Sequence, residues 1–232
     1  MSTTAELTQL VRDITDLDEA DLPSALIRTF MRDGFDRILN LERRWPWLEA
    51  STTLNTVASQ RDYLMSTIAS NTFREITSVT DTSLAGNRLQ LIPLEDAERI
   101  YNGALDTASR PIYFAEWADT IKLYPKPDTV YPLAIRGYRK PTYTWLTNTA
   151  LEPDCDDRLH TAIAYYAISQ SYKRQEDNEL AQVYKQSYDE AVALARREIM
   201  RPSSNRPMIM SRGSAPMNWR YYMQQLGRTL GQ

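Results

Sequence analysis

The sequence predicts an α+β protein: a bundle of about four helices with an inserted β-rich subdomain and an extended C-terminal arm. Apolar residues recur at helical spacing in residues 1–47 and again in residues 142–200. Between them, residues 48–141 hold short runs rich in Thr, Val, Tyr and Ile, which are typical of strands. Residues 201–232 show no sustained period. We therefore expect a helical body in two parts (1–47 and 142–200), a β insertion (48–141) and a docking arm (201–232).

Two helices are expected in the first part of the body. Thr3 and Glu6 have the spacing of a capping box, in which each side chain satisfies a free N–H of the other residue. A helix should follow them, and a second one of about five turns should bury its apolar residues from Ile27 to Leu41. Trp45-Pro46-Trp47 ends this second helix, because the residue before a proline resists the helical conformation.

Short strands fill the β insertion, and two of them form a hairpin that turns at Ala118-Asp119. A short helix is expected from Pro93 to Tyr101. The expected strands are Thr52–Val57, Tyr63–Thr67, Phe73–Val79, Asn87–Ile92, Ile112–Trp117, Thr120–Tyr124 and Val130–Tyr138.

A helical hairpin should complete the body. Pro153-Asp154 opens its first helix, where the carboxylates of Asp154, Asp156 and Asp157 meet the electropositive end. The corner Glu176-Asp177-Asn178 then caps a fourth helix that runs to about Ile199. Because this connection is short, the two helices should lie antiparallel.

Composition indicates an ordinary soluble protein, with 42% apolar and 25% charged residues. The N-terminus has neither the basic start nor the apolar core of a secretory signal. Cys155 is the single cysteine, so no intramolecular disulfide forms, which suits a reducing cytoplasm. The net charge of −3 is unevenly placed. The arm holds five arginines and no acidic residue, which leaves 22 basic and 30 acidic side chains in residues 1–200.

No catalytic site is expected. The chain has no phosphate-binding glycine loop, no GxSxG and no HExxH. Its one histidine, His160, and Cys155 should lie on different helix faces, which disfavours a metal or thiol role. Trp45 and Trp47 could stack on a sugar or a base, but packing is the favoured interpretation. The acidic clusters could suggest a cell-wall hydrolase, although helix capping already explains both. The two acidic clusters are Asp154, Asp156 and Asp157, and Glu176, Asp177 and Glu179. We therefore expect no enzyme activity, no cofactor and no metal.

The arm is expected to dock on a partner. Its arginines alternate with methionines and aromatic residues, the types that dominate interface hot spots and adapt to irregular grooves. Ordering about 32 residues costs more entropy than these anchors return, so we expect the arm to order only in a partner's groove. The alternative is a nucleic-acid-binding module that uses the same arginines and aromatic rings. The predicted docking residues are Arg201, Arg206, Met208, Met210, Arg212, Trp219, Arg220, Tyr221, Tyr222 and Arg228.

Three sequence blocks carry a resemblance to a known family. They are IKLYPKPDTVYPLAIRGYRKP (Ile121–Pro141), the helix opening LEPDCDDRLHTAIAYYA (Leu151–Ala167) and the Glu-Asp-Asn corner. Their order resembles that of the head-to-tail adaptor proteins of tailed bacteriophages, also called head-completion or connector proteins. The chain departs from that pattern in its long β insertion and in Asp119, where glycine is expected at the hairpin corner.

The resemblance implies a structural virion protein. Such adaptors assemble, usually as dodecamers, beneath the portal ring, and they line part of the channel for the genome. Their C-terminal segments insert between portal subunits, and the matching segment here is Arg201–Gln232. The implied partners are a portal protein and a downstream tail protein. Double-stranded DNA passes without sequence-specific binding, no membrane is involved, and assembly takes place in the host cytoplasm. The acidic first 200 residues suit this role, because they repel phosphates.

Overall fold

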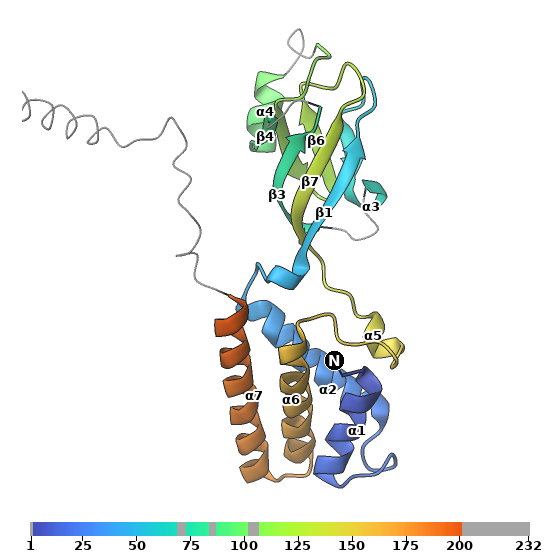
Figure 1. Cartoon of the computed structure of the whole chain (residues 1–232), viewed down its shortest axis with the longest axis vertical. Helices are drawn as coiled ribbons and strands as arrows, with labels where there is room; N and C mark the ends of the chain where they lie inside the picture. The colour runs from blue at the N-terminus through green and yellow to red at the C-terminus, as the bar shows by residue number, and fades with distance from the viewer. Residues whose placement is uncertain (1, 69–72, 84–86, 102–106, 201–232) are drawn as a thin grey trace, which may run out of the picture. The chain divides into compact units, whose positions relative to one another are not determined.

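Helices occupy both ends of the described chain, and strands lie between them in the sequence (Figure 1). The structure is a computed structural model that describes residues 2–68, 73–83, 87–101 and 107–200. Among these residues, no helix has the length and apolar character that crossing a membrane requires.

Four long helices make up the helical part: α1 (Thr4–Thr15), α2 (Ser24–Leu41), α6 (His160–Arg174) and α7 (Asn178–Ile199). The predicted capping box is confirmed at α1. The Oγ1 of Thr3 accepts the N–H of Glu6 at 3.3 Å, and a carboxylate oxygen of Glu6 accepts the N–H of Thr3 at 2.9 Å. The corner before α7 is also confirmed. Glu176 adopts φ 64°, and Asp177 accepts the N–H of Leu180 at 3.0 Å.

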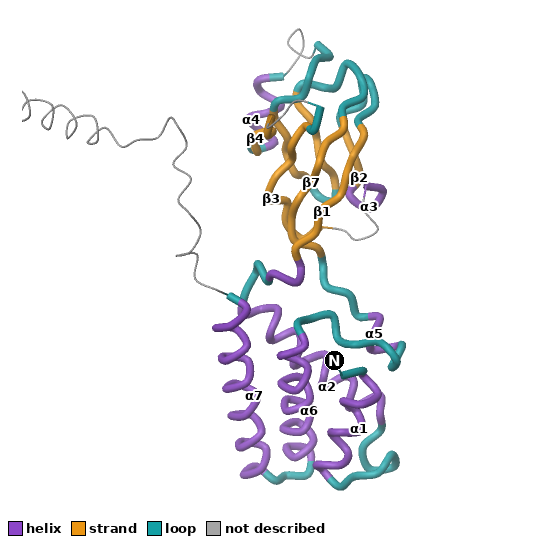
Figure 2. The backbone as a smooth tube through the Cα atoms, in the orientation of Figure 1, coloured by secondary structure: helices purple, strands orange, loops and turns teal. Residues whose placement is uncertain are grey.

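Helix α6 lies at the centre of the helical part, where it contacts α1, α2 and α7 (Figure 2). Its small side chains let neighbouring helices approach closely, and Ala162, Ala164 and Ala167 are fully buried. At the closest approach Gly34 of α2 faces Tyr166, where an added Cβ would lie 2.9 Å from the Tyr166 Cβ. α6 corresponds to the third predicted long helix, but it begins at His160 rather than near Asp154. The short 3₁₀ helix η3 (Asp157–Leu159) precedes it.

The strands form one seven-stranded sheet with the order β1-β7-β3-β4-β5-β6-β2. Adjacent strands are antiparallel except for β4 and β5, which are parallel. The strands are β1 (Glu49–Asn55), β2 (Asp62–Leu64), β3 (Phe73–Asp81), β4 (Asn87–Leu91), β5 (Tyr113–Trp117), β6 (Thr120–Tyr124) and β7 (Pro132–Arg139). Between them lie η1 (Pro46–Leu48), α3 (Met65–Ile68) and α4 (Leu94–Ile100), and α5 (Thr144–Thr147) follows β7.

The sheet curls into a half-barrel, so that its two edges approach each other. Leu54 of edge strand β1 and Tyr63 of edge strand β2 belong to the same buried cluster. The Tyr63 hydroxyl also accepts the N–H of Val57, just beyond β1, at 3.0 Å. The core of the sheet is therefore the inner face of a single curled layer. Burial raises the pKa of the Tyr63 hydroxyl.

The predicted architecture, a bundle of about four helices with an inserted β-rich subdomain, is wrong. The described residues form seven α-helices, three of them single-turn or two-turn, and a β-rich half-barrel of seven strands. Sequence patterns predicted most strands one by one, but their closure into one curled sheet depends on pairing between distant residues, such as β1 with β7. The predicted strand Tyr63–Thr67 is also corrected, because β2 ends at Leu64 and α3 begins at Met65.

Strands β6 and β7 are consecutive in the chain but do not pair. β6 lies between β5 and β2, whereas β7 lies between β1 and β3. The Pro-Lys-Pro-Asp connection therefore links two different parts of the curled sheet rather than closing a hairpin. The hairpin expected at Ala118-Asp119 is confirmed, since β5 pairs with β6 and Ala118 adopts φ 51°.

The proposed division of the chain into four segments stays a prediction, and the extended arm lies outside the described residues.

Candidate functional site

The predicted docking residues all belong to the arm, residues 201–232, and therefore lie outside the described residues. Their role stays a prediction. The surfaces that the structure does describe offer three further candidates: the outer face of α7, the junction at Arg139, and a group of side chains around His160.

Helix α7 is held firmly by its inner face. The Tyr188 hydroxyl is buried and donates to the carbonyl of Gly34 in α2 at 3.1 Å. Ser169 of α6 donates to the carbonyl of Ala181 at 2.7 Å. Burial raises the pKa of Tyr188, so this hydroxyl stays a donor at any physiological pH. α7 therefore presents its other face on a rigid support.

The outer face of α7 carries an apolar stripe, which we define as Leu180, Val183 and Leu194. Their exposed fractions are 40%, 56% and 60%. The spacing from 180 to 183 to 194 keeps the three side chains on one face of a helix. Single exposed apolar residues are normal on protein surfaces, but three on one helix face make that face a candidate for a contact.

The junction between β7 and the helical part is fixed by an ion pair. Arg139 Nη1 donates to Asp154 Oδ2 at 2.6 Å, and Nη2 donates to Oδ1 at 2.5 Å. The N–H and hydroxyl of Thr142 also donate to Oδ2, at 2.7 and 3.0 Å. Burial alone would raise the pKa of Asp154, but these hydrogen bonds outweigh it and lower the pKa. Asp154 thus closes the loop after β7 and does not cap a helix, which corrects its predicted role.

The junction also rests on Glu75 of β3, which forms ion pairs with Arg43 and Arg44, just after α2. The hydrogen bond from Arg44 lowers the pKa of the Glu75 carboxyl. Sequence reasoning missed both this contact and the Arg139–Asp154 pair. The partners of the first are about thirty residues apart, and no local pattern indicates such a contact.

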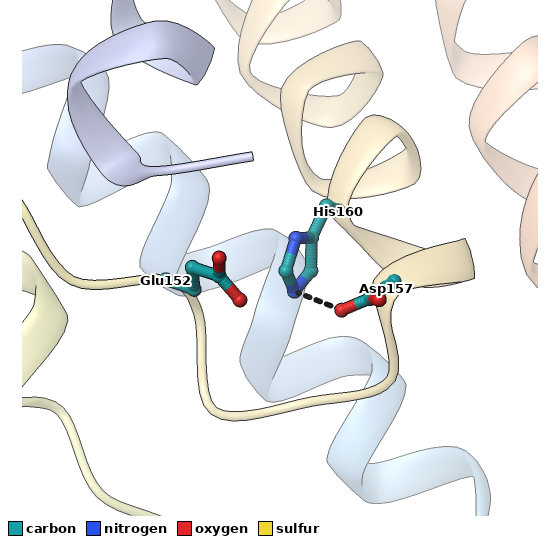
Figure 3. A group of neighbouring side chains, drawn as sticks. All are labelled: Glu152, Asp157 and His160. Atoms are coloured by element: carbon teal, nitrogen blue, oxygen red, sulfur yellow. Dashed lines mark ion pairs between the residues drawn. The ribbon is translucent and has the colours of Figure 1, made fainter. Parts of the chain in front are cut away.

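His160 lies in a group with Glu152 and Asp157 (Figure 3). One ligand-type atom from each residue lies within 4.8 Å of those of the other two. The His160 side chain is 1% exposed. Its Nδ1 accepts the N–H of Ser2 at 3.4 Å, and Nε2 lies 4.0 Å from Asp157 Oδ1.

Cys155 does not belong to that group. Burial, with the neighbouring carboxylates of Asp154, Asp156 and Asp157, raises the pKa of its thiol well above the ordinary value. The thiol therefore stays protonated and is a poor nucleophile.

The two tryptophans after α2 pack as predicted. Trp45 is fully buried, and its Nε1 donates to the carbonyl of Ile38 at 3.0 Å. Trp47 stacks on it with 4.3 Å between ring centroids. Trp45 is thus part of the core and cannot present its ring to a sugar or a base.

Comparison with protein families identifies a match over most of the chain. Residues 2–211 match the family described as SU10 adaptor protein. The chain belongs to this family of phage head-to-tail adaptors. The matched region includes all the described helices and strands and extends into the arm. No curated protein matches the chain.

The family assignment confirms the resemblance and decides the broad role. The adaptor is a structural component of the virion that works between the phage head and its tail. We therefore expect its functional sites to be contact surfaces. The outer face of α7 and the arm are the two candidates.

Proposed function

We propose that this adaptor forms a ring between the portal and the next tail protein, and that the genome passes through the ring. The observation that carries the proposal is the family match across residues 2–211. In this assembly the body sets the geometry of the ring, which we expect to be a dodecamer, and the arm attaches it to the portal.

The stripe on α7 is our proposed contact between neighbouring copies of the chain. A ring requires each subunit to contact the next through two different surfaces, so one apolar helix face per subunit is sufficient for one side of that contact. The stripe suits this role because it is apolar, exposed and carried by a helix whose other face is buried.

Charge supports passage of DNA without binding. The first 200 residues carry eight more acidic than basic side chains, and such an excess repels phosphates. The five arginines of the arm are the exception, and we assign them to the portal rather than to DNA. Arg, Trp and Tyr together are typical of the centre of a protein interface.

Removing the arm tests the attachment. Met1–Ile199 forms one compact unit, so a chain that ends at Met200 should fold and keep its stability. We expect it to lose retention on purified portal rings, measured by co-sedimentation or electron microscopy. In the full chain, Trp219→Ala should weaken binding by about 2 kcal/mol, which is roughly thirtyfold.

The outcomes separate the two candidate functions. Unchanged portal retention after truncation contradicts attachment through the arm. Retention of double-stranded DNA by the full chain, weakening steeply with salt and lost on truncation, supports the nucleic-acid-binding alternative instead.

A further inference from the structure

The group of Glu152, Asp157 and His160 has the composition of a divalent cation site. It supplies one imidazole nitrogen and two carboxylate oxygens from a short stretch of chain. Glu152 lies in the loop after α5, Asp157 in η3, and His160 is the first residue of α6. Figure 3 shows the imidazole ring between the Glu152 and Asp157 carboxylates, with a dashed line that joins one ring nitrogen to Asp157.

The buried histidine is the independent observation that points to a ligand. His160 is 1% exposed, and its Nε2 has no hydrogen-bond partner among the described residues. This atom is directed at the two carboxylates, with Asp157 Oδ1 4.0 Å away. A buried polar atom in a native protein is nearly always satisfied, so an imidazole nitrogen aimed at two acids indicates a bound group.

The distances allow three ligands to share one ion. Ligands that each lie about 2.1 Å from a tetrahedral ion are about 3.4 Å from one another. The three atoms lie within 4.8 Å of one another, so a contraction of at most about 1.4 Å brings them into range. Glu152 is in a loop and the Asp157 side chain is 49% exposed, which leaves both free to make that movement.

The choice of donors narrows the range of ions. Imidazole nitrogen suits zinc and its neighbours, whereas Mg²⁺ and Ca²⁺ require oxygen ligands throughout. Zinc binds above manganese in the usual order of affinities. We propose that Glu152, Asp157 and His160 bind one Zn²⁺ ion, with solvent completing its coordination.

The histidine must change its tautomer to bind. Nδ1 now accepts the N–H of Ser2, which places the ring proton on Nε2. Binding through Nε2 moves that proton to Nδ1 or to solvent, and it gives up the Ser2 contact. That contact is long at 3.4 Å, so little opposes the change.

The ion would act as a structural clip. The same loop bonds the start of α1, since the N–H groups of Thr4 and Ala5 donate to the carbonyls of Leu151 and Thr149, both at 3.0 Å. One ion would therefore join this loop to the start of α6. Because a ligand that binds only the folded state stabilises it, Zn²⁺ should raise the unfolding temperature.

The test uses the full, untagged chain after removal of metal with a chelator. We expect isothermal titration to give one Zn²⁺ per chain and a rise in the unfolding temperature. Because the chain has one histidine, nitrogen NMR should show directly whether Nε2 changes on binding. Glu152→Gln and Asp157→Asn should each weaken zinc binding by at least about tenfold. Both residues lie outside the buried core, so the folded state should survive.

The matched control is Asp156→Asn, one position away and outside the group. Its carboxylate accepts the N–H of Arg158 at 3.2 Å, and zinc binding should not change. The proposal is overturned if the chain binds no zinc, or if Glu152→Gln and Asp157→Asn bind as well as the parent. An equal loss in Asp156→Asn, or an unchanged Nε2 signal, overturns it as well. Cys155→Ser should retain full binding, and a loss there would reassign the zinc to the thiol.

Discussion

At the scale of single residues, Arg139 and Asp154 determine how the chain leaves the sheet and enters the helical part. Both side chains are only 17% exposed, and each oxygen of Asp154 receives a guanidinium N–H. Arg139→Ala leaves a largely buried carboxylate without its cation. We expect a loss of about 3 kcal/mol in the free energy of unfolding, measured by urea denaturation. Lys140→Ala is the control, since its side chain is 55% exposed, and it should change stability by less than about 0.5 kcal/mol.

Glu116 of β5 provides a pH-dependent prediction. Burial, and then the charge of Glu75, raise the pKa of its carboxyl above 4.5, although a hydrogen bond from the Ile76 backbone acts the other way. A raised carboxyl pKa means that the folded state favours the protonated form. Its contribution to stability is therefore full below the ordinary pKa and is lost as pH rises through the folded-state value.

Replacing that carboxyl by an amide removes the unfavourable charge. Glu116→Gln should be more stable than the parent at pH 7, and the gain should shrink as pH falls towards 4.5. Thermal unfolding at a series of pH values measures it. Glu95→Gln, on the exposed face of α4, should stay within about 0.5 kcal/mol of the parent throughout. A gain for Glu116→Gln that does not depend on pH would show that packing, not charge, is responsible.

At the scale of elements, α7 contributes to the core and also carries the proposed contact between copies. Its inner face buries Tyr188, Val192 and Ala195, while the stripe faces outward. The double variant Val183→Asp, Leu194→Asp removes two apolar contacts of about 1.5–3 kcal/mol each. We expect association between copies to weaken more than about a hundredfold. The mass of adaptor bound per portal ring, measured by light scattering, gives the result.

The matched control for the stripe places the same charges elsewhere on α7. Gln182→Asp with Ala193→Asp changes two exposed positions that lie outside the stripe. It should assemble as the parent does. Equal assembly by the stripe variant would rule out this face as the contact between copies.

Also at the scale of elements, Gly137 shows why β7 tolerates a bulge in its partner. An added Cβ would lie 2.2 Å from the backbone oxygen of Glu75 in β3. The pairing of these two strands shifts register between Phe73 and Glu75 and again between Ile76 and Ser78. Glycine is therefore required by the close approach of a bulged strand, which has no signature in the sequence of β7 itself.

At the scale of the whole molecule, charge separates the chain into an acidic part and a basic arm. Residues 1–200 hold 30 acidic and 22 basic side chains, and all five charges of the arm are positive. This separation of charge is what the proposed roles require, namely that residues 1–200 repel phosphates and that the arm binds a groove of the portal. This asymmetry is a property of the sequence. Portal binding by the truncated chain tests whether the basic arm attaches the adaptor to the portal.

The sequence by itself determined the local structure and the family. The capping box at Thr3, the corner at Asp177 and most strands could be predicted, because caps, turns and periodicity depend on neighbouring residues. The docking role of the arm stays a prediction. Even the Asp157-x-x-His160 spacing was visible, but the burial of that histidine was not.

Only the tertiary structure decided which residues meet. It closed seven strands into a half-barrel, paired Arg139 with Asp154 and brought Glu152 to His160. The physical reason is that strand pairing and buried polar contacts depend on the sum of many weak, non-local interactions. The local sequence shows that a strand can pair or that a carboxylate can accept a hydrogen bond, but the partner is determined by the whole fold.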